Sequence, residues 1–256
     1  MDVPSLILKQ IGTSQLEPRI ASQFAMTTDT PIQSVSMEGL DHCLDELKGG
    51  AMPVGTVEFV RKAMSLAGMA EPDNFSYPDV LGKYLMRELR QQTAGEINGN
   101  WFVKPVTTKT FTGFVLDTAN TENLGQHDRE QFEVFLSLPQ NTIVWVSEPV
   151  TWLSEFRYYV ESGEVIGFGR YDGGPDDLPE PDLSAVKIMA SEFFKTPGAP
   201  SAFSLDVGVL GTGKTALIEC NDAWALGYYR GTLSHKDYIK MLWKRWSQLF
   251  NLRVNE

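Results

Sequence analysis

Three oxygen-bearing side chains lie near the C-terminal end of the chain. Segment 204–227 holds two apolar runs around a glycine-rich turn, with Asp206 in the first run and Glu219 and Asn221 in the second. In a hairpin with an even-length turn, Asp206 lies directly opposite Glu219, and Asn221 follows two residues along on the same face. Two bare carboxylates there would repel each other unless a divalent cation bridges them, and Mg²⁺ prefers oxygen ligands of this kind. The spacing therefore predicts a magnesium site, whereas an odd-length turn would flip one strand and remove this geometry. The alternative is a solvated edge hairpin with scattered acids.

The same segment also contains Gly208-x-x-x-x-Gly213-Lys214-Thr215, the phosphate-loop pattern. A phosphate loop needs a helix immediately after its glycines, because the amides at the helix N-terminus hold the phosphates. Residues 215–222 instead form a short β-compatible run with no helix start signal. The sequence therefore favours the hairpin.

Two lysines, Lys104 and Lys109, lie close together in the sequence in the middle of the chain. Lys104 ends an apolar strand, and Lys109 precedes Phe111-Thr-Gly113, whose glycine suits a flexible turn near a ligand. Paired lysines on adjacent strands are suitable polyphosphate binders, since each is a compact, movable positive charge. The alternative is that both are surface charges.

A second hairpin is predicted around Ser162-Gly163, because the residues on both sides alternate in polarity. Its short turn puts Glu155 opposite Arg170, either as a cross-strand ion pair or as a pair of ligand-binding groups. Arg157 has Phe168 as its expected neighbour in register. Its guanidinium is therefore expected to be free for a phosphate or a carboxylate.

Composition limits the class of protein. The chain has 256 residues, 42% of them hydrophobic, and a formal net charge of −11, which argues against nucleic acid as the main partner. Its two cysteines, Cys43 and Cys220, provide neither a disulfide framework nor a zinc-binding spacing. There is no basic N-terminal signal and no apolar run of membrane-spanning length. These features predict a soluble, cytoplasmic protein that binds no membrane.

The expected elements divide the chain into two parts. Residues 1–95 have the pattern of a small α/β region. Residues 96–256 form the second part, in which strands predominate from about residue 96. In the first part, strands are expected at 6–8 and 32–36, and helices at 39–47, 57–66 and 78–89. In the second, strands are expected at 101–105, 111–116, 142–147, 154–160, 164–171 and in the acidic hairpin, and helices at 128–136, 183–194 and from 234 onward. The apolar stripe of the last helix indicates core packing.

Several short motifs occur in a fixed order. They are Phe102-Val-Lys104-Pro, Lys109-x-Phe-x-Gly113, Val146-Ser-Glu148-Pro, Ser154-Glu-Phe-Arg157, Gly169-Arg170-Tyr171, Asp206-Val-Gly and Glu219-Cys-Asn221. This ordered set resembles the ATP-grasp superfamily, and within it the compact clade of bacterial and phage proteins that is named for an arginine and two lysines. The resemblance runs from about residue 101 to residue 229, and residues 53–78 look like the N-terminal region of that clade.

The resemblance implies an α+β fold in which two α+β subdomains clamp a nucleotide, next to the small α/β N-terminal region. It also implies a role for each motif. Lys104 and Lys109 would hold the α- and β-phosphates of ATP. The strand that meets adenine and ribose would be lined by Val146, Ser147 and Glu148. Arg157 and Arg170 would face the γ-phosphate and the acyl substrate, and Mg²⁺ would be carried by Asp206, Glu219 and Asn221.

The implied activity is an ATP- and Mg²⁺-dependent carboxylate–amine or carboxylate–thiol ligase. Such an enzyme forms an acyl phosphate on a small molecule, a peptide or a protein end, and needs no protein nucleophile. The alternative is a non-catalytic module that keeps the fold and binds a nucleotide or a partner.

Overall fold

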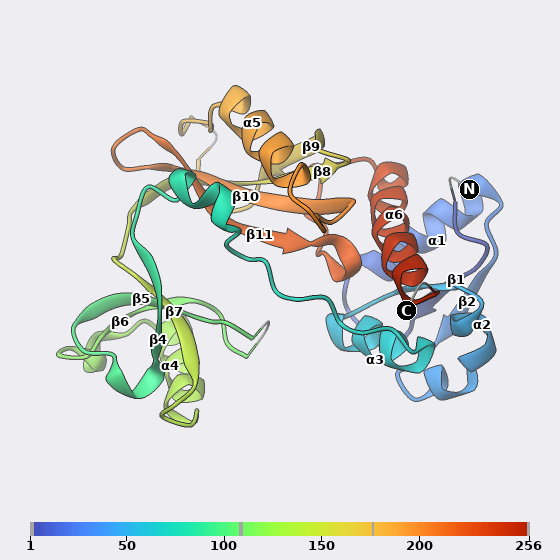
Figure 1. Ribbon diagram of the computed structural model, residues 1–256, viewed down its shortest axis with the longest axis horizontal. Helices are drawn as coiled ribbons and strands as arrows, with labels where there is room; N and C mark the ends of the chain where they lie inside the picture. Colours follow the sequence, from blue (N-terminus) through green and yellow to red (C-terminus); the bar gives the residue numbers. More distant parts are fainter. Residues whose placement is uncertain (1–2, 108–109, 176, 255–256) are drawn as a thin grey trace.

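The computed structural model describes residues 3–107, 110–175 and 177–254. Lys109 lies outside the described residues. The described residues form three sheets, and Figure 1 shows the central one between the N-terminal region and a smaller sheet. Short 3₁₀ helices interrupt the loops at η1 (Gly39–His42), η2 (Asp79–Tyr84), η3 (Ala94–Glu96), η4 (Thr121–Asn123) and η5 (Ala223–Ala225).

The N-terminal sheet is parallel and has the strand order β2-β1-β3, with β1 at Ile7–Gln10, β2 at Ile32–Val35 and β3 at Met52–Val54. Its helices are α1 (Glu17–Thr28), α2 (Leu44–Lys48) and α3 (Val57–Ala67). The side chain of Thr56 caps α3 by accepting the amide of Phe59, and Gly68 ends the helix in the left-handed region. The α3 prediction is confirmed, but the single helix expected at 39–47 is wrong, because η1 and α2 divide that segment.

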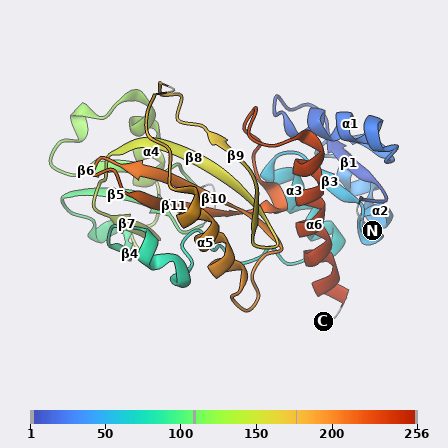
Figure 2. The same ribbon diagram turned by 90° about the horizontal axis from the view of Figure 1, so that it is seen from above.

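Helix α6 (His235–Val254) completes the core of this N-terminal region. Its buried residues Tyr238, Leu242 and Trp246 belong to the same apolar cluster as Ile7 and Phe24. Figures 1 and 2 both show α6 beside α1, between the N-terminal sheet and the central sheet. The predicted packing role of the α6 stripe is therefore confirmed, whereas the division of the chain at residue 95 stays a prediction.

The central sheet is antiparallel in the order β11-β10-β8-β9. Its strands are β8 (Trp152–Glu161), β9 (Glu164–Arg170), β10 (Ala202–Leu210) and β11 (Thr215–Asp222), and α5 (Leu183–Phe194) covers one face. The side chain of Asp182 caps α5 by accepting the amide of Ser184. Because α5 buries one face, the residues that alternate onto the other face are available for the site.

The small sheet is antiparallel in the order β4-β7-β5-β6. Its strands are β4 (Leu89–Thr93), β5 (Asn100–Pro105), β6 (Phe114–Asp117) and β7 (Ile143–Ser147), with α4 (Gln126–Leu136) packed against them. The helix expected at 78–89 is wrong. The short η2 occupies its first half, and β4 then pairs with β7 from Leu89 onward, so tertiary pairing overrides the local helical spacing.

Within the described ranges, no helix has both the length and the apolar character that a bilayer span requires.

Candidate functional site

The β10–β11 turn differs from the predicted one. The amide of Leu210 donates to the carbonyl of Lys214, so residues 211–213 form an odd-length turn, and Gly213 takes a positive φ of 80° there. The expectation of an even-length turn is wrong. By itself, this turn would put Asp206 and Glu219 on opposite faces.

A β-bulge corrects the register. Near the turn Val207 pairs with Leu217, but the next pair along the strands is Asp206 with Glu219. Ile218 is therefore an extra residue in β11, and it shifts the rest of the strand by one position. The predicted pairing of Asp206 with Glu219 is confirmed, although it depends on the bulge rather than on the turn.

A strand, not a helix, follows the glycine-lysine turn. β11 begins at Thr215, and Lys214 is exposed in the turn before it. Since a strand and not a helix continues the chain from the turn, the phosphate-loop alternative is excluded.

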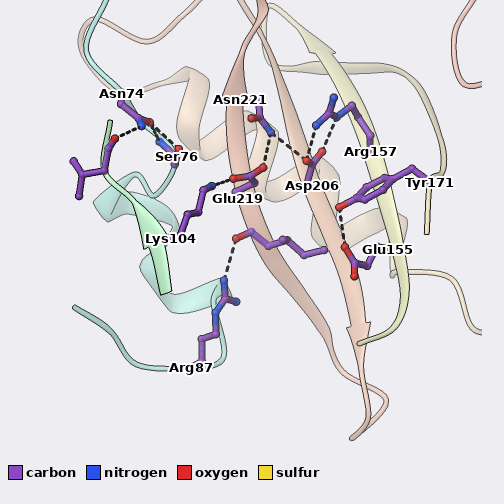
Figure 3. Close-up of polar contacts among 12 residues, drawn as sticks. Asn74, Ser76, Arg87, Lys104, Glu155, Arg157, Tyr171, Asp206, Glu219 and Asn221 are labelled. Atoms are coloured by element: carbon purple, nitrogen blue, oxygen red, sulfur yellow. Dashed lines mark hydrogen bonds and ion pairs between the residues drawn. The ribbon is translucent and has the colours of Figure 1, made fainter. Parts of the chain in front are cut away.

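The side chains of Asp206, Glu219 and Asn221 form a carboxylate–amide cluster (Figure 3). Asn221 Nδ2 donates to Asp206 Oδ2 at 3.1 Å and to Glu219 Oε1 at 3.3 Å. In the described part of the chain, no group of three His, Cys, Asp or Glu side chains converges as metal ligands would. The cluster thus offers two carboxylates and one amide, a set that suits Mg²⁺ when substrate phosphates supply the remaining oxygens.

Arg157 is tied to this cluster. Its Nε and Nη2 donate to the two oxygens of Asp206 at 2.8 and 2.7 Å, and its Nη1 donates to the carbonyl of Gly227 at 3.3 Å. The guanidinium carbon also lies 4.7 Å from the ring centroid of Tyr229. Burial lowers the pKa of Arg157, but the charge and hydrogen bonds of Asp206 outweigh it and leave the pKa raised. The expectation of a free guanidinium is wrong, because β8 and β10 bring Arg157 and Asp206 side by side.

A second bulge separates Arg170 from the cluster. Between Tyr159 and Val160 the β8–β9 register shifts by one residue, so Arg170 pairs with Phe156 rather than with Glu155. The predicted Glu155–Arg170 pair is therefore wrong, as is the pairing of Arg157 with Phe168, since Arg157 lies opposite Gly169.

Arg170 consequently shares a face with Phe156, on the side of the sheet that α5 covers. Its Nε donates to Asp172 Oδ1 at 2.5 Å. The structure does not bring Arg170 together with Arg157.

Lys104 reaches the cluster from the small sheet. It lies near the end of β5 and forms an ion pair with Glu219 on β11, and its Nζ is 5.1 Å from the ring centroid of Tyr77. Burial, together with the positive charges of Arg87 and Arg157, lowers the pKa of Lys104 to about 8, although the charge of Asp206 acts in the opposite direction. Of the two lysines that were predicted to hold the α- and β-phosphates, Lys104 is the one among the described residues.

A cavity of about 910 Å³ lies between the small sheet and the central sheet. Lys104, Glu219 and Asn221 line it, as do the predicted residues Ser147 and Glu148. Val146 does not line it, because its side chain is fully buried in the core of the small sheet. The volume is in the range of small-molecule and cofactor sites.

Three further polar residues line the cavity: Glu155, which the sequence offered as an ion-pair partner or a ligand-binding group, and Tyr171 and Arg87, to which it gave no role. Tyr171 Oη donates to Glu155 Oε2 at 3.0 Å, and burial raises the pKa of Glu155. Arg87 also lines the cavity. The alternation of β8 placed Glu155 on the face of Arg157, but Arg87 had no signal because its segment looked helical.

Solved structures share this fold at low sequence identity. D-alanine–D-alanine ligase from Bacillus anthracis complexed with ATP has a TM-score of 0.54 at 11% identity, with 98% of this chain and 99% of that chain covered. D-cycloserine synthetase DcsG has a TM-score of 0.55 at 11% identity, with 95% and 99% covered. ATP-grasp ligase PsnB, complexed with precursor peptide PsnA2 and AMPPNP, has a TM-score of 0.50 at 11% identity, with 96% and 97% covered. At such identities the likeness shows the fold alone.

No curated protein sequence matches this chain. The family model of an ATP-grasp domain, the second family of the clade named for an arginine and two lysines, matches residues 84–241, which is more than half of the 256 residues. The α+β ATP-grasp fold expected from the ordered motifs is confirmed. The chain therefore belongs to the second family of this arginine-and-two-lysine clade of ATP-grasp domains.

Proposed function

We propose that this protein is an ATP- and Mg²⁺-dependent ligase that joins a carboxylate to an amine or a thiol. One observation carries the proposal. Glu219 and Asn221 of the carboxylate–amide cluster, on the central sheet, and Lys104, on the small sheet, line a single cavity large enough for a nucleotide, and the buried Asp206 adjoins it through Asn221. Anionic oxygens for a cation and a cation for phosphates are thus within reach of the same ligand.

The residues proposed to bind ATP and Mg²⁺ come from both the small sheet and the central sheet. Asp206, Glu219 and Asn221 would hold Mg²⁺, which would neutralise charge on the ATP phosphates. Lys104 would bind the α- and β-phosphates, with Lys109 as the proposed second lysine. Ser147 and Glu148 would contact adenine and ribose, because both line the cavity. Val146 is buried in the core of the small sheet and Arg170 lies on the other face of the central sheet, so the proposal gives neither of them a ligand contact.

Arg157 is proposed to orient the γ-phosphate and the acyl substrate. A guanidinium has five N–H donors, and Asp206 and Gly227 take three of them in the bonds described above. The ion pair with Asp206 fixes the plane of the guanidinium, so the remaining donors have a set direction. Such preorganised positive charge is the usual protein contribution to phosphoryl transfer.

The reaction would proceed in two displacements. A carboxylate oxygen of the substrate attacks the γ-phosphorus of ATP, the bond to the ADP oxygen breaks, and an acyl phosphate forms. The nitrogen of an amine, or the sulfur of a thiol, then attacks the acyl carbon. The carbon–oxygen bond to phosphate breaks, and the nucleophile loses its proton.

A second cavity, of about 200 Å³, supports a site for the acyl and amine substrates. It lies beside the cluster and is lined by Val57 of α3, by Trp224, and by Arg157 and Asn221. Asn221 lines both cavities. The precursor peptide of PsnB and the names of the two other enzymes, a D-alanine–D-alanine ligase and a D-cycloserine synthetase, support a small molecule, a peptide or a protein end as the substrate class.

The test is product formation with defined acceptor pools. We expect ADP and phosphate release only when ATP, Mg²⁺ and a suitable carboxylate–amine or carboxylate–thiol pair are present, with a new amide or thioester mass in the product. The matched variant is Glu219→Gln, which keeps the size of the side chain and removes its charge. Product formation that is independent of ATP, or undiminished in Glu219→Gln, would contradict the proposal.

One observation favours the alternative, a non-catalytic nucleotide- or partner-binding module. Both carboxylates of the cluster already contact protein cations, Asp206 with Arg157 and Glu219 with Lys104. In that case ATP would bind with unchanged affinity in Glu219→Gln, and no acceptor pool would release phosphate.

A further inference from the structure

The bulge in β11 turns the strand over between Leu217 and Glu219. In a regular strand these two residues would share a face, because side chains alternate. Here Leu217 is fully buried in the α5-side core with Val207, whereas Glu219 lines the cavity with Asn221. The extra residue Ile218 is therefore what puts the two β11 members of the cluster on the face of Asp206.

Arg87 binds the backbone of this bulge (Figure 3). Its Nη1 donates to the carbonyl of Leu217 at 2.9 Å and its Nη2 donates to the carbonyl of Ile218 at 3.0 Å. Nη1 also contacts the carbonyl of Leu85 at 3.1 Å. A bulge disrupts the ladder locally, so these two carbonyls need donors from outside the hairpin.

The other side of the Arg87 guanidinium is also fixed. Its carbon lies 5.6 Å from the ring centroid of Trp152, at the start of β8. Trp152 in turn lies so close to Gly208 that a Cβ there would come within 2.5 Å of the ring. Arg87 is thus held between the bulge and a ring that rests on β10.

The linker that carries Arg87 contacts β11 on both sides of Glu219. The carbonyl of Ser76 accepts the amide of Cys220 at 2.8 Å, and Arg87 binds the two residues that precede Glu219. Met86, directly before Arg87, has a φ of 52°, in the left-handed region that a non-glycine residue adopts only with strain. The surrounding contacts hold this strained turn, which orients the guanidinium towards the bulge.

We propose that Arg87 is a positioning residue for the Mg²⁺ site. Its planar fork fixes the bulge, and the bulge fixes the face on which Glu219 and Asn221 lie. The inference rests on the proposed function, because it assumes that this cluster binds a divalent cation. Arg87 acts through Glu219 rather than on the cation itself, and this separates it from a simple phosphate ligand.

The experiment is a double-mutant cycle on cation affinity. Mn²⁺ is titrated into the full chain with saturating AMPPNP, for the unaltered protein, Arg87→Ala, Glu219→Ala and the double variant. We expect each single change to weaken Mn²⁺ binding by about fivefold or more, and the double variant to bind within about twofold of Glu219→Ala. Arg90→Ala is the control, because Arg90 lies three residues further along, in β4, with its guanidinium carbon 4.3 Å from the ring centroid of Trp101, and does not line the cavity.

Each other outcome has a distinct meaning. Losses that multiply in the double variant, or unchanged Mn²⁺ affinity in Arg87→Ala, would overturn the positioning role while leaving the metal assignment intact. Unchanged affinity in Glu219→Ala would instead overturn the metal assignment of the proposed function. Hydrogen exchange provides a readout without cation, since Arg87→Ala should speed exchange of the β11 amides near Ile218 and leave the β5–β6 amides unchanged.

A second variant covers the case in which Arg87→Ala does not fold. Arg87→Lys keeps the positive charge but lacks the planar fork that reaches two carbonyls. We expect it to weaken Mn²⁺ binding nearly as much as the alanine change. Affinity like that of the unaltered protein would mean that charge alone is sufficient, and would overturn the proposal.

Discussion

Lys104 and Glu219 form an ion pair that joins the small sheet to the central sheet across the cavity. These residues are 115 positions apart in the chain, and each comes from the face of its sheet that lines the cavity. A ligand that enters here must compete for both charges, so the two residues are expected to control nucleotide binding.

Replacement of Lys104 by alanine should weaken nucleotide binding. A hydrogen bond to a charged group contributes about 1.5–3 kcal/mol, so the Kd for AMPPNP should rise about 10- to 100-fold. Calorimetric titration measures this. Lys214→Ala is the matched control, because Lys214 is exposed in the β10–β11 turn and its loss should leave the Kd unchanged. The reverse pattern would rule out Lys104 as a phosphate ligand.

Nucleotide affinity should also fall in mildly alkaline solution. The pKa of Lys104 is about 8, so its positive charge, which binds phosphate, is present below pH 8 and is lost as the pH rises through that value. We expect the Kd for AMPPNP to increase between about pH 7.5 and 9.5, because the Lys104 ammonium loses its proton in this window. Lys104→Arg should remove this dependence, since arginine stays charged. The same pH profile in both proteins would contradict the assignment.

The Arg157–Asp206 pair should be important for stability. Both side chains are at least nine-tenths buried, and removal of one partner of a buried pair costs about 3–5 kcal/mol because the other charge is left unpaired. Arg157→Ala should therefore lower Tm by about 10 °C in a chain of this size, as followed by circular dichroism. Arg61→Ala removes an exposed pair with Glu71 and should change Tm by no more than about 2 °C. Equal effects of the two changes would argue against this account.

Gly208 should not tolerate a side chain. A Cβ there would lie 2.5 Å from the ring of Trp152 and 2.7 Å from the carbonyl oxygen of Ser154, and backbone cannot easily move. Gly208→Ala should destabilise the protein by about 1–3 kcal/mol, measured by urea unfolding. At Gly211 a Cβ would meet only Thr151 at 3.7 Å, so Gly211→Ala is the control and should be nearly neutral. A stable Gly208→Ala variant would mean that Trp152 can move away.

The sequence predicted elements better than it predicted register. Helix α5 has the predicted bounds because its apolar spacing and its Asp182 cap are both local features. The Asp206–Glu219 pair was predicted correctly, but through two compensating errors, an odd-length turn and the bulge at Ile218. In the β8–β9 hairpin nothing compensates for the register shift of the bulge, so Arg170 lies on the opposite face from the predicted one.

The β11 bulge could not be read from periodicity, because the residue that binds its backbone is distant in sequence. Arg87 lies 130 positions before Leu217, whose carbonyl it binds. Its own segment was predicted as helix from local spacing, whereas β4 takes its shape from pairing with β7. Helix α1 was not predicted, although Pro18 in its first turn is a helix-start signal.

The shared packing of α6 with the N-terminal sheet has a consequence for synthesis on the ribosome. Ile7 and Phe24 are translated before the central and small sheets, but Tyr238, Leu242 and Trp246, which cover them, are translated after both. The apolar surface of β1 and α1 therefore stays exposed while the strands of both other sheets are translated. A nascent chain halted after the small sheet should bind chaperones, because helix α6 has not yet covered the apolar surface of β1 and α1.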